Sequence, residues 1–139
     1  AASMFKRLRA MSAADEGSKY PVWREEASHL GNLIRHLPAA AVLNHREDLD
    51  WLAKEDRVCV RAWQALTRFS EFDSEGAQQL IWLIDDSSRF TKQRGDDWQH
   101  PNLAGLIGLC EMGAAGANAI QPLYDRLWGS GFLPTRSRR

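Results

Sequence analysis

The sequence predicts a single all-α domain, an irregular bundle of five to six helices with flexible basic termini. Apolar residues recur at helical spacing along most of the chain, and no stretch alternates apolar and polar residues as a half-buried strand would. Glycine, proline and asparagine fall at the intervals that mark helix ends. The 139 residues, 44% of them hydrophobic and 26% charged, are enough for one domain with its own core.

The two ends of the chain differ in charge from its body. Residues 1–3, which precede Met4, are interpreted as an expression remnant, and residues 4–139 as the domain. We expect flexible ends at residues 4–19, with a short basic helix over 4–12, and at residues 130–139. Six basic residues lie near the ends: Lys6, Arg7, Arg9, Arg136, Arg138 and Arg139. Without them, 12 basic residues face 18 acidic ones, so the body is negative.

The first long helix is predicted to begin at Pro21 and to end before Pro38. Its apolar stripe has heptad-like spacing and comprises Trp23, Ala27, Leu30, Ile34 and Leu37. A short helical turn over residues 39–43 should follow. Asn44 and Glu47 have the spacing of a capping box, which predicts a new helix starting at Asn44.

The central part of the chain is predicted to form two further helices. Two adjacent acids, Glu55 and Asp56, interrupt the apolar stripe, so we expect a bend or a fresh helix start there, with Asp56 as a possible cap. A helix is then predicted from residue 57 to Phe69. The buried face of that helix should comprise Cys59, Val60, Trp63, Leu66 and Phe69. Asp73 or Ser74 should cap the next helix, which is predicted to be largely buried and to end near Gly95.

The last third of the chain is rich in small residues. After a polar loop over residues 95–100, a helix is predicted from Pro101 to Met112. Glycines inside a helix cost stability, so their number here indicates either close approach of a neighbouring helix or a break around residues 113–116. A final helix over residues 120–127 should end at Gly129.

The six tryptophans favour a protein-binding function. Small domains use such aromatic bulk to build a dense core or to hold a partner. Trp98 lies in a polar loop with no apolar periodicity around it, and Trp51 stands outside a clean stripe. Trp128, followed by Phe132, lies near the chain end and is suited to docking on another subunit. We therefore expect a non-catalytic interaction module: a small subunit, adaptor or inhibitor that binds another protein.

Arginines carry an alternative function, contact with the backbone of DNA or RNA. On a continuous helix, Arg57, Arg61 and Arg68 would project along one side, opposite Trp63, and no acid occurs from residue 57 to residue 70. Guanidinium groups suit phosphate oxygens. A second basic cluster follows the next predicted helix and comprises Arg89, Lys92 and Arg94. This hypothesis requires the arginine face to be unpaired; protein binding is compatible with arginines held in intramolecular pairs.

The sequence carries no nucleophile motif and no phosphate-binding glycine loop. We therefore expect that the protein is not an enzyme and that it binds no cofactor. Glu26 and His29 have the E-x-x-H spacing of bundle metal sites, but no inward-facing glutamates accompany them, and we predict no metal site. Residues 25–29 and 47–50 resemble in part the EExxE…ExxD pattern of MazG-type pyrophosphatases. This resemblance implies a Mg²⁺-dependent all-α nucleotide pyrophosphatase as a second alternative, with His29 standing where the third acid is expected.

The cysteines and the hydropathy pattern indicate the compartment. Cys59 and Cys110 lie far apart in apolar helical patterns, which predicts two buried thiols and a reducing, cytoplasmic setting. No apolar run reaches the length of a membrane span, so we expect no membrane contact.

Overall fold

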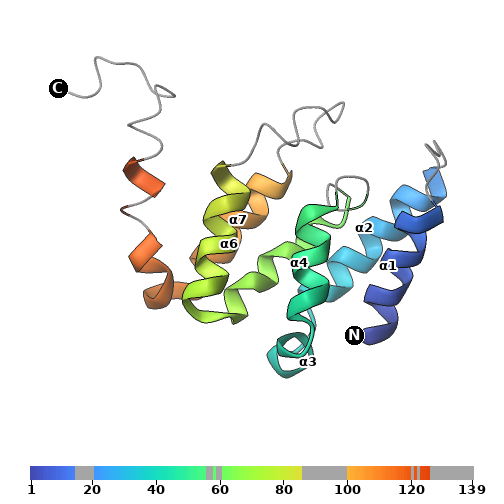
Figure 1. Ribbon diagram of the computed structural model, residues 1–139, viewed down its shortest axis with the longest axis horizontal. Coiled ribbons are helices and arrows are strands. Elements are labelled where there is room, and N and C mark those ends of the chain that lie inside the picture. Colours follow the sequence, from blue (N-terminus) through green and yellow to red (C-terminus); the bar gives the residue numbers. More distant parts are fainter. Residues whose placement is uncertain are drawn as a thin grey trace, which may run out of the picture.

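Figure 1 shows the computed structural model, which describes residues 1–14, 21–55, 58, 61–85, 100–119, 121 and 123–125. The regular structure in these ranges is helical throughout, which confirms the predicted all-α class. In chain order the elements are α1 (Ala2–Ala14), α2 (Pro21–Arg35), α3 (Ala39–Leu43), α4 (Arg46–Lys54), α5 (Trp63–Leu66), η1 (Thr67–Glu71), α6 (Asp73–Asp85), α7 (His100–Met112) and η4 (Gly113–Ala119).

The helices form an elongated arrangement with the segment α5–η1 at its centre. In Figure 1, α1, α2 and α4 lie at one end, α6 and α7 lie beside each other further along, and η4 lies at the other end. Helix α5 packs against α2, α4 and α7, while η1 packs against α6 and α7. The short central segment therefore joins the two ends into one body.

One hydrophobic core runs through this body. Residues from α1 to α7 that are at most 2% exposed include Phe5, Leu8, Ile34, Leu49, Leu52, Leu66, Phe69, Leu80, Leu83 and Ala104. Residues 4–14 were expected to belong to a flexible end of the chain. They lie in α1 and bring Phe5, Leu8 and Met11 into this core. Burial of a leucine or phenylalanine side chain contributes about 2 kcal/mol, so α1 is held largely by its apolar face.

Helix α2 and the short helix after it follow the sequence prediction. Ala27 and Ile34 are fully buried, Trp23, Leu30 and Leu37 pack against the core, and the helix ends before Pro38. Gly31 allows the close approach of α5's leading turn, because a Cβ there would lie 2.7 Å from the Cα of Ala62.

The predicted capping box at Asn44 is not formed. Asn44 is instead the C-cap of α3, and α4 begins at Arg46 with His45 at its N-cap and no side-chain cap hydrogen bond. The expected bend at Glu55 is present, because Glu55 has an extended backbone and ends α4. The possible cap at Asp56 lies outside the described residues.

The prediction of one regular helix from residue 57 to Phe69 is wrong, because the described part of this segment is irregular. Arg61 and Ala62 lie in a turn, α5 has only four residues, and Thr67–Glu71 is a 3-10 helix. Ala65, Leu66, Thr67, Arg68 and Phe69 are all buried. Within the acid-free stretch, residues 65–69 are therefore part of the core rather than of a basic solvent face.

Helices α6 and α7 pack closely through glycines. Added Cβ atoms at Gly105 and Gly108 would meet the carbonyl oxygen of Leu80 at 2.5 Å and the Leu80 side chain, so close approach explains these two residues. Helix α6 begins at Asp73, so Asp73 is its first residue rather than the predicted cap, and the Phe72 carbonyl oxygen before it accepts from the Gly76 amide. The described part of α6 ends at Asp85, and the predicted end near Gly95 lies outside the described residues.

The chain breaks its α-helical path at Gly113. Gly113 has a φ of +58°, which only glycine adopts without strain, and the chain continues as the 3-10 helix η4. The break predicted around residues 113–116 is thus confirmed. Cys110, predicted to be buried, is instead an exposed thiol on α7, and Cys59 lies outside the described residues.

Candidate functional site

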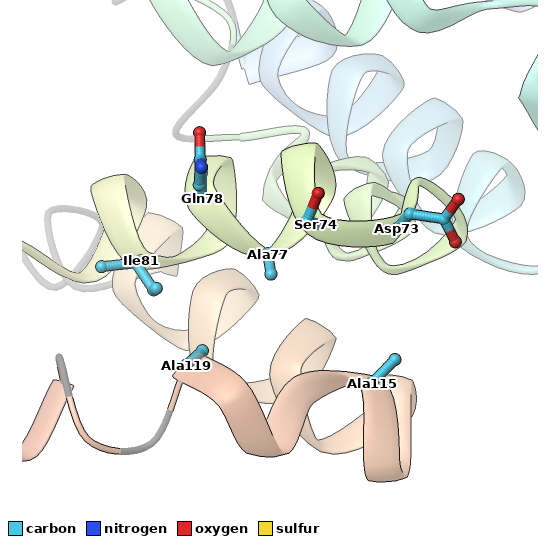
Figure 2. Close-up of a pocket in the computed structure, with 7 residues that line it drawn as sticks. All are labelled: Asp73, Ser74, Ala77, Gln78, Ile81, Ala115 and Ala119. Atoms are coloured by element: carbon cyan, nitrogen blue, oxygen red, sulfur yellow. The ribbon is translucent and has the colours of Figure 1, made fainter.

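The candidate site is a groove between α6 and η4, with a volume of about 350 Å³. Asp73, Ser74, Ala77, Gln78 and Ile81 line it from α6, and Ala115 and Ala119 from η4 (Figure 2). Three of these seven side chains are methyl groups and one is an isoleucine, so the lining is predominantly apolar. We call this feature the α6–η4 groove.

Two rows of apolar side chains face each other across the groove. Figure 2 shows Ala77 and Ile81 pointing from α6 toward η4, while Ala115 and Ala119 point back toward α6. Ala77, Ile81 and Ala119 are each at most 9% exposed, whereas Ala115 is exposed at the mouth. The narrow floor is therefore apolar and the mouth is open to solvent.

Polar side chains stand at the rim rather than at the floor. Ser74 and Gln78 point away from η4 in Figure 2, and Asp73 lies at the end where α6 begins. Asp73 is the single ionisable side chain in the lining. General acid–base chemistry uses a positioned side chain whose pKa suits the proton transfer, often with a second group beside it, and in the lining of this groove Asp73 stands without such a second group.

The local sequence explains why a groove forms here. The positive φ of Gly113 turns the chain back after α7, so that η4 runs alongside α6 and packs against both helices. Gly116 lies against Leu109, where a Cβ would be 2.5 Å from the carbonyl oxygen. Small side chains at positions 115 and 119 leave the space between η4 and α6 unfilled.

A second depression, of about 360 Å³, lies where α4 meets the start of α6. It contains Arg46, whose guanidinium is 2.8 Å from Glu75 and 3.4 Å from Asp50 and lies over the Phe72 ring. This cation is already neutralised within the chain, so the depression is a less suitable binding site than the α6–η4 groove.

Of the tryptophans and the phenylalanine predicted to bind a partner, Trp51 alone lies within the described residues. It is half-buried against the core, and the Arg9 guanidinium lies 4.5 Å from its ring centroid. Trp51 is thus engaged within the fold, at the junction of α1 and α4. Trp98, Trp128 and Phe132 lie outside the described residues.

Of the arginine face predicted for nucleic acid, the structure describes Arg61 and Arg68, and Arg68 does not face solvent. Arg68 is 7% exposed and donates to the carbonyl oxygens of Arg35 and Leu37, at 2.6 and 2.5 Å, and to Glu71 at 3.1 Å. It ties the end of α2 to η1 instead of facing solvent. Arg61 stacks over the Trp23 ring at 4.9 Å. Arg57, Arg89, Lys92 and Arg94 lie outside the described residues.

The acids of the second alternative are spread over separate pairings. Glu26 accepts hydrogen bonds from Arg7, and Asp48 from Arg9, while His29 is exposed. Within the described ranges, no three His, Cys, Asp or Glu side chains come together in a way that would hold a metal ion. The convergence that a Mg²⁺ site needs is therefore not formed there.

Sequence reasoning missed a polar cluster that attaches α1 to α2 and α4, called here the α1 clasp. It contains Arg7–Glu26 at 2.6 Å, Arg9–Asp48 at 2.8 Å, His45–Asp48 at 2.8 Å and Ser12–Glu55 at 2.7 Å. The indole of Trp23 also donates to the Met11 carbonyl, and His45 stacks on Phe5. Apart from His45 and Asp48, which are three residues apart, these partners are 12 to 43 residues apart in sequence, so no local pattern reveals them.

The α1 clasp lowers the pKa of two carboxyl groups. Hydrogen bonding from Arg7 lowers the pKa of Glu26. For Asp48, partial burial acts to raise the pKa, but the hydrogen bonds from His45 and Arg9 outweigh it and the pKa is lowered. Both groups are therefore charged at neutral pH and favour the docked position of α1.

Comparison with known proteins finds no match, either to a family model, to a curated protein or to a solved structure. The function must therefore be argued from the site. In the part of the chain that the structure describes, no helix combines the length and the apolarity needed to cross a membrane.

Proposed function

We propose that this chain is a non-catalytic helical interaction module, a subunit, adaptor or inhibitor that binds another protein. The α6–η4 groove carries the proposal, because its floor is apolar and its mouth is open to solvent, so that it suits an apolar side chain of a partner. Apolar anchors that fill such pockets supply much of the binding energy of protein interfaces.

The character of the lining supports binding rather than catalysis. One carboxylate, Asp73, stands at the rim with the hydroxyl of Ser74, and the facing side of the groove is made of alanines. Such rim groups orient a ligand through hydrogen bonds. We propose that the bound segment is apolar, with a polar or basic group near Asp73.

The intramolecular hydrogen bonds and ion pairs of the described arginines favour this function over contact with nucleic acid. Arg68 is held by two carbonyl groups and Glu71, and Arg9 and Arg46 are paired with acids. Because these cations already have partners within the chain, they would gain little free energy from binding phosphate. A reducing, cytoplasmic setting stays part of the proposal and is supported by the exposed thiol of Cys110, since such thiols persist in reducing compartments.

Site-specific photo-cross-linking tests the proposal. A benzoylphenylalanine placed at Ala115 lies at the mouth of the groove, whereas one at Ala114 is exposed on η4 but outside the lining. We expect an adduct with a specific protein from position 115 in cells of the source organism, and none from position 114. Equal adducts from both positions, or none from either, would contradict a partner site in the groove.

A further inference from the structure

The outward face of α7 is apolar and exposed. Leu103 and Leu106 are 40% and 44% exposed, and Cys110 is exposed one further step along the same stripe. These residues stand at i, i+3 and i+7, so they share one side of the helix over about 10 Å of its length. No charged residue occurs from Pro101 to Cys110.

Asn102, a polar residue in the first turn of this helix, is turned inward. The Asn102 amide donates to the carbonyl oxygens of Leu83 and Ile84, at 3.2 and 2.8 Å, and so caps the end of α6. The outward stripe therefore offers water no side-chain hydrogen bond. A helix that is apolar on all sides is normally covered on all sides.

The position of this face is fixed by the opposite side of α7. Gly105 and Gly108 lie so close to Leu80 that a Cβ at either position would be within 2.5 Å of it. Because these contacts leave no room for larger groups, α7 cannot rotate to bury Leu103 and Leu106 in its own core. The stripe therefore stays on the outward side of α7.

We propose that this stripe, called the α7 stripe, binds the α7 stripe of a second copy of the chain in an antiparallel pair. With a two-fold axis beside Leu106, Leu103 of each copy faces Cys110 of the other, and Leu106 faces Ile107. The proposal does not depend on the α6–η4 groove, whose lining residues lie on other elements.

The charge at the two ends of α7 favours this occupant and this direction. The first turn of α7 has no acidic residue, and the first turn of a helix carries partial positive charge. Glu111, at the other end, is half-exposed and lies 3.9 Å from Arg35. Antiparallel pairing brings each Glu111 to the partner's first turn, whereas parallel pairing brings the two carboxylates together.

The size of the stripe predicts a weak dimer. Stable complexes bury about 1,200 Å² or more in total, and a single pair of short helices buries less. We therefore expect a dissociation constant on the order of 10–100 µM. Rapid exchange between monomer and dimer follows from such an affinity.

Sedimentation velocity over concentrations on both sides of this constant is the first measurement. The full chain should move from monomer to dimer, and Leu106→Asp should remain monomeric throughout. Leu43→Asp is the matched control, because Leu43 is 48% exposed on α3, away from α7. A full chain that stays monomeric at every concentration, or equal loss of the dimer in both variants, would overturn the proposal.

Disulfide trapping tests the direction, and it does not depend on the aspartate variant being folded. Under mild oxidation, Leu103→Cys should give a covalent dimer, because the new thiol lies opposite Cys110 of the other copy. The double variant Leu103→Cys/Cys110→Ser should not. A covalent dimer formed through Cys110 alone would show a parallel pair and contradict the antiparallel one. Loss of this dimer while position 115 still cross-links another protein would leave the proposed function intact.

Discussion

At the scale of single residues, Arg68 shows how burial reverses an interpretation based on residue type. An arginine in a stretch without acids indicates a basic face, yet Arg68 lies in a run of buried residues from 65 to 69. The guanidinium satisfies two carbonyl groups at the end of α2 that would otherwise lack donors. The pattern of charges alone does not distinguish a solvent face from a buried capping role.

Removal of the Arg68 side chain should therefore destabilise the fold strongly. Arg68→Met leaves the Arg35 and Leu37 carbonyls and Glu71 without their donors, and we expect a loss of about 3 kcal/mol in the free energy of unfolding. Arg68→Lys should lose less, because it keeps the charge. Urea denaturation measures both. A change within about 0.5 kcal/mol for Arg68→Met, the range typical of surface substitutions, would show that Arg68 is not buried in solution.

The two carboxyl groups of the α1 clasp should make stability fall in acid. The pKa values of Glu26 and Asp48 are lower in the folded chain than in the unfolded chain. Their contribution is therefore fully present above the unfolded pKa values, near pH 4, and is lost as the pH falls through the folded values. Thermal unfolding followed between neutral pH and about pH 3 should show this decline.

The variant Asp48→Asn isolates the Asp48 part of that pH dependence. It removes the ionisable partner of Arg9 and His45 while keeping the size of the side chain. We expect lower stability than the natural chain at neutral pH and a smaller difference in acid. Parallel pH profiles for the two proteins would contradict the assigned pKa direction.

At the scale of elements, regular amphipathic helices were predictable and irregular segments were not. The α2 stripe of Trp23, Ala27, Leu30 and Ile34 has one repeating spacing, and the structure buries that side. The segment around Arg61 and Thr67 changes from turn to α-helix to 3-10 helix, and each change is imposed by neighbours distant in sequence. Propensity gives way to tertiary packing there.

Close approach between elements gives a further prediction at Gly31. Gly31→Ala places a methyl group 2.7 Å from the Cα of Ala62, so α2 or the turn before α5 must shift. We expect a loss of about 2 kcal/mol in unfolding free energy, even though alanine is the better helix former. Asn32→Ala, at an exposed neighbouring position on α2, is the control and should leave stability nearly unchanged. A stabilised Gly31→Ala protein would mean that α2 and α5 are not in this contact.

At the scale of the whole molecule, the class of the fold was predictable but the candidate site was only partly so. The abundance of small residues after Pro101 predicted either a close approach or a break, and the structure shows a close approach at Gly105 and a break at Gly113. That Ala115 and Ala119 face α6 across a groove follows from the turn at Gly113, which sets the path of η4. A sequence pattern contains no information on that path.

The proposed function requires that the α6–η4 groove holds an apolar segment of another protein. Its most direct test uses the protein that cross-links to position 115, purified and titrated calorimetrically against two matched variants. Ala115→Trp fills the mouth of the groove, and Ala114→Trp adds the same bulk outside it. We expect an affinity about 30-fold weaker for Ala115→Trp and unchanged for Ala114→Trp. Equal affinities for both variants and the natural chain would contradict it.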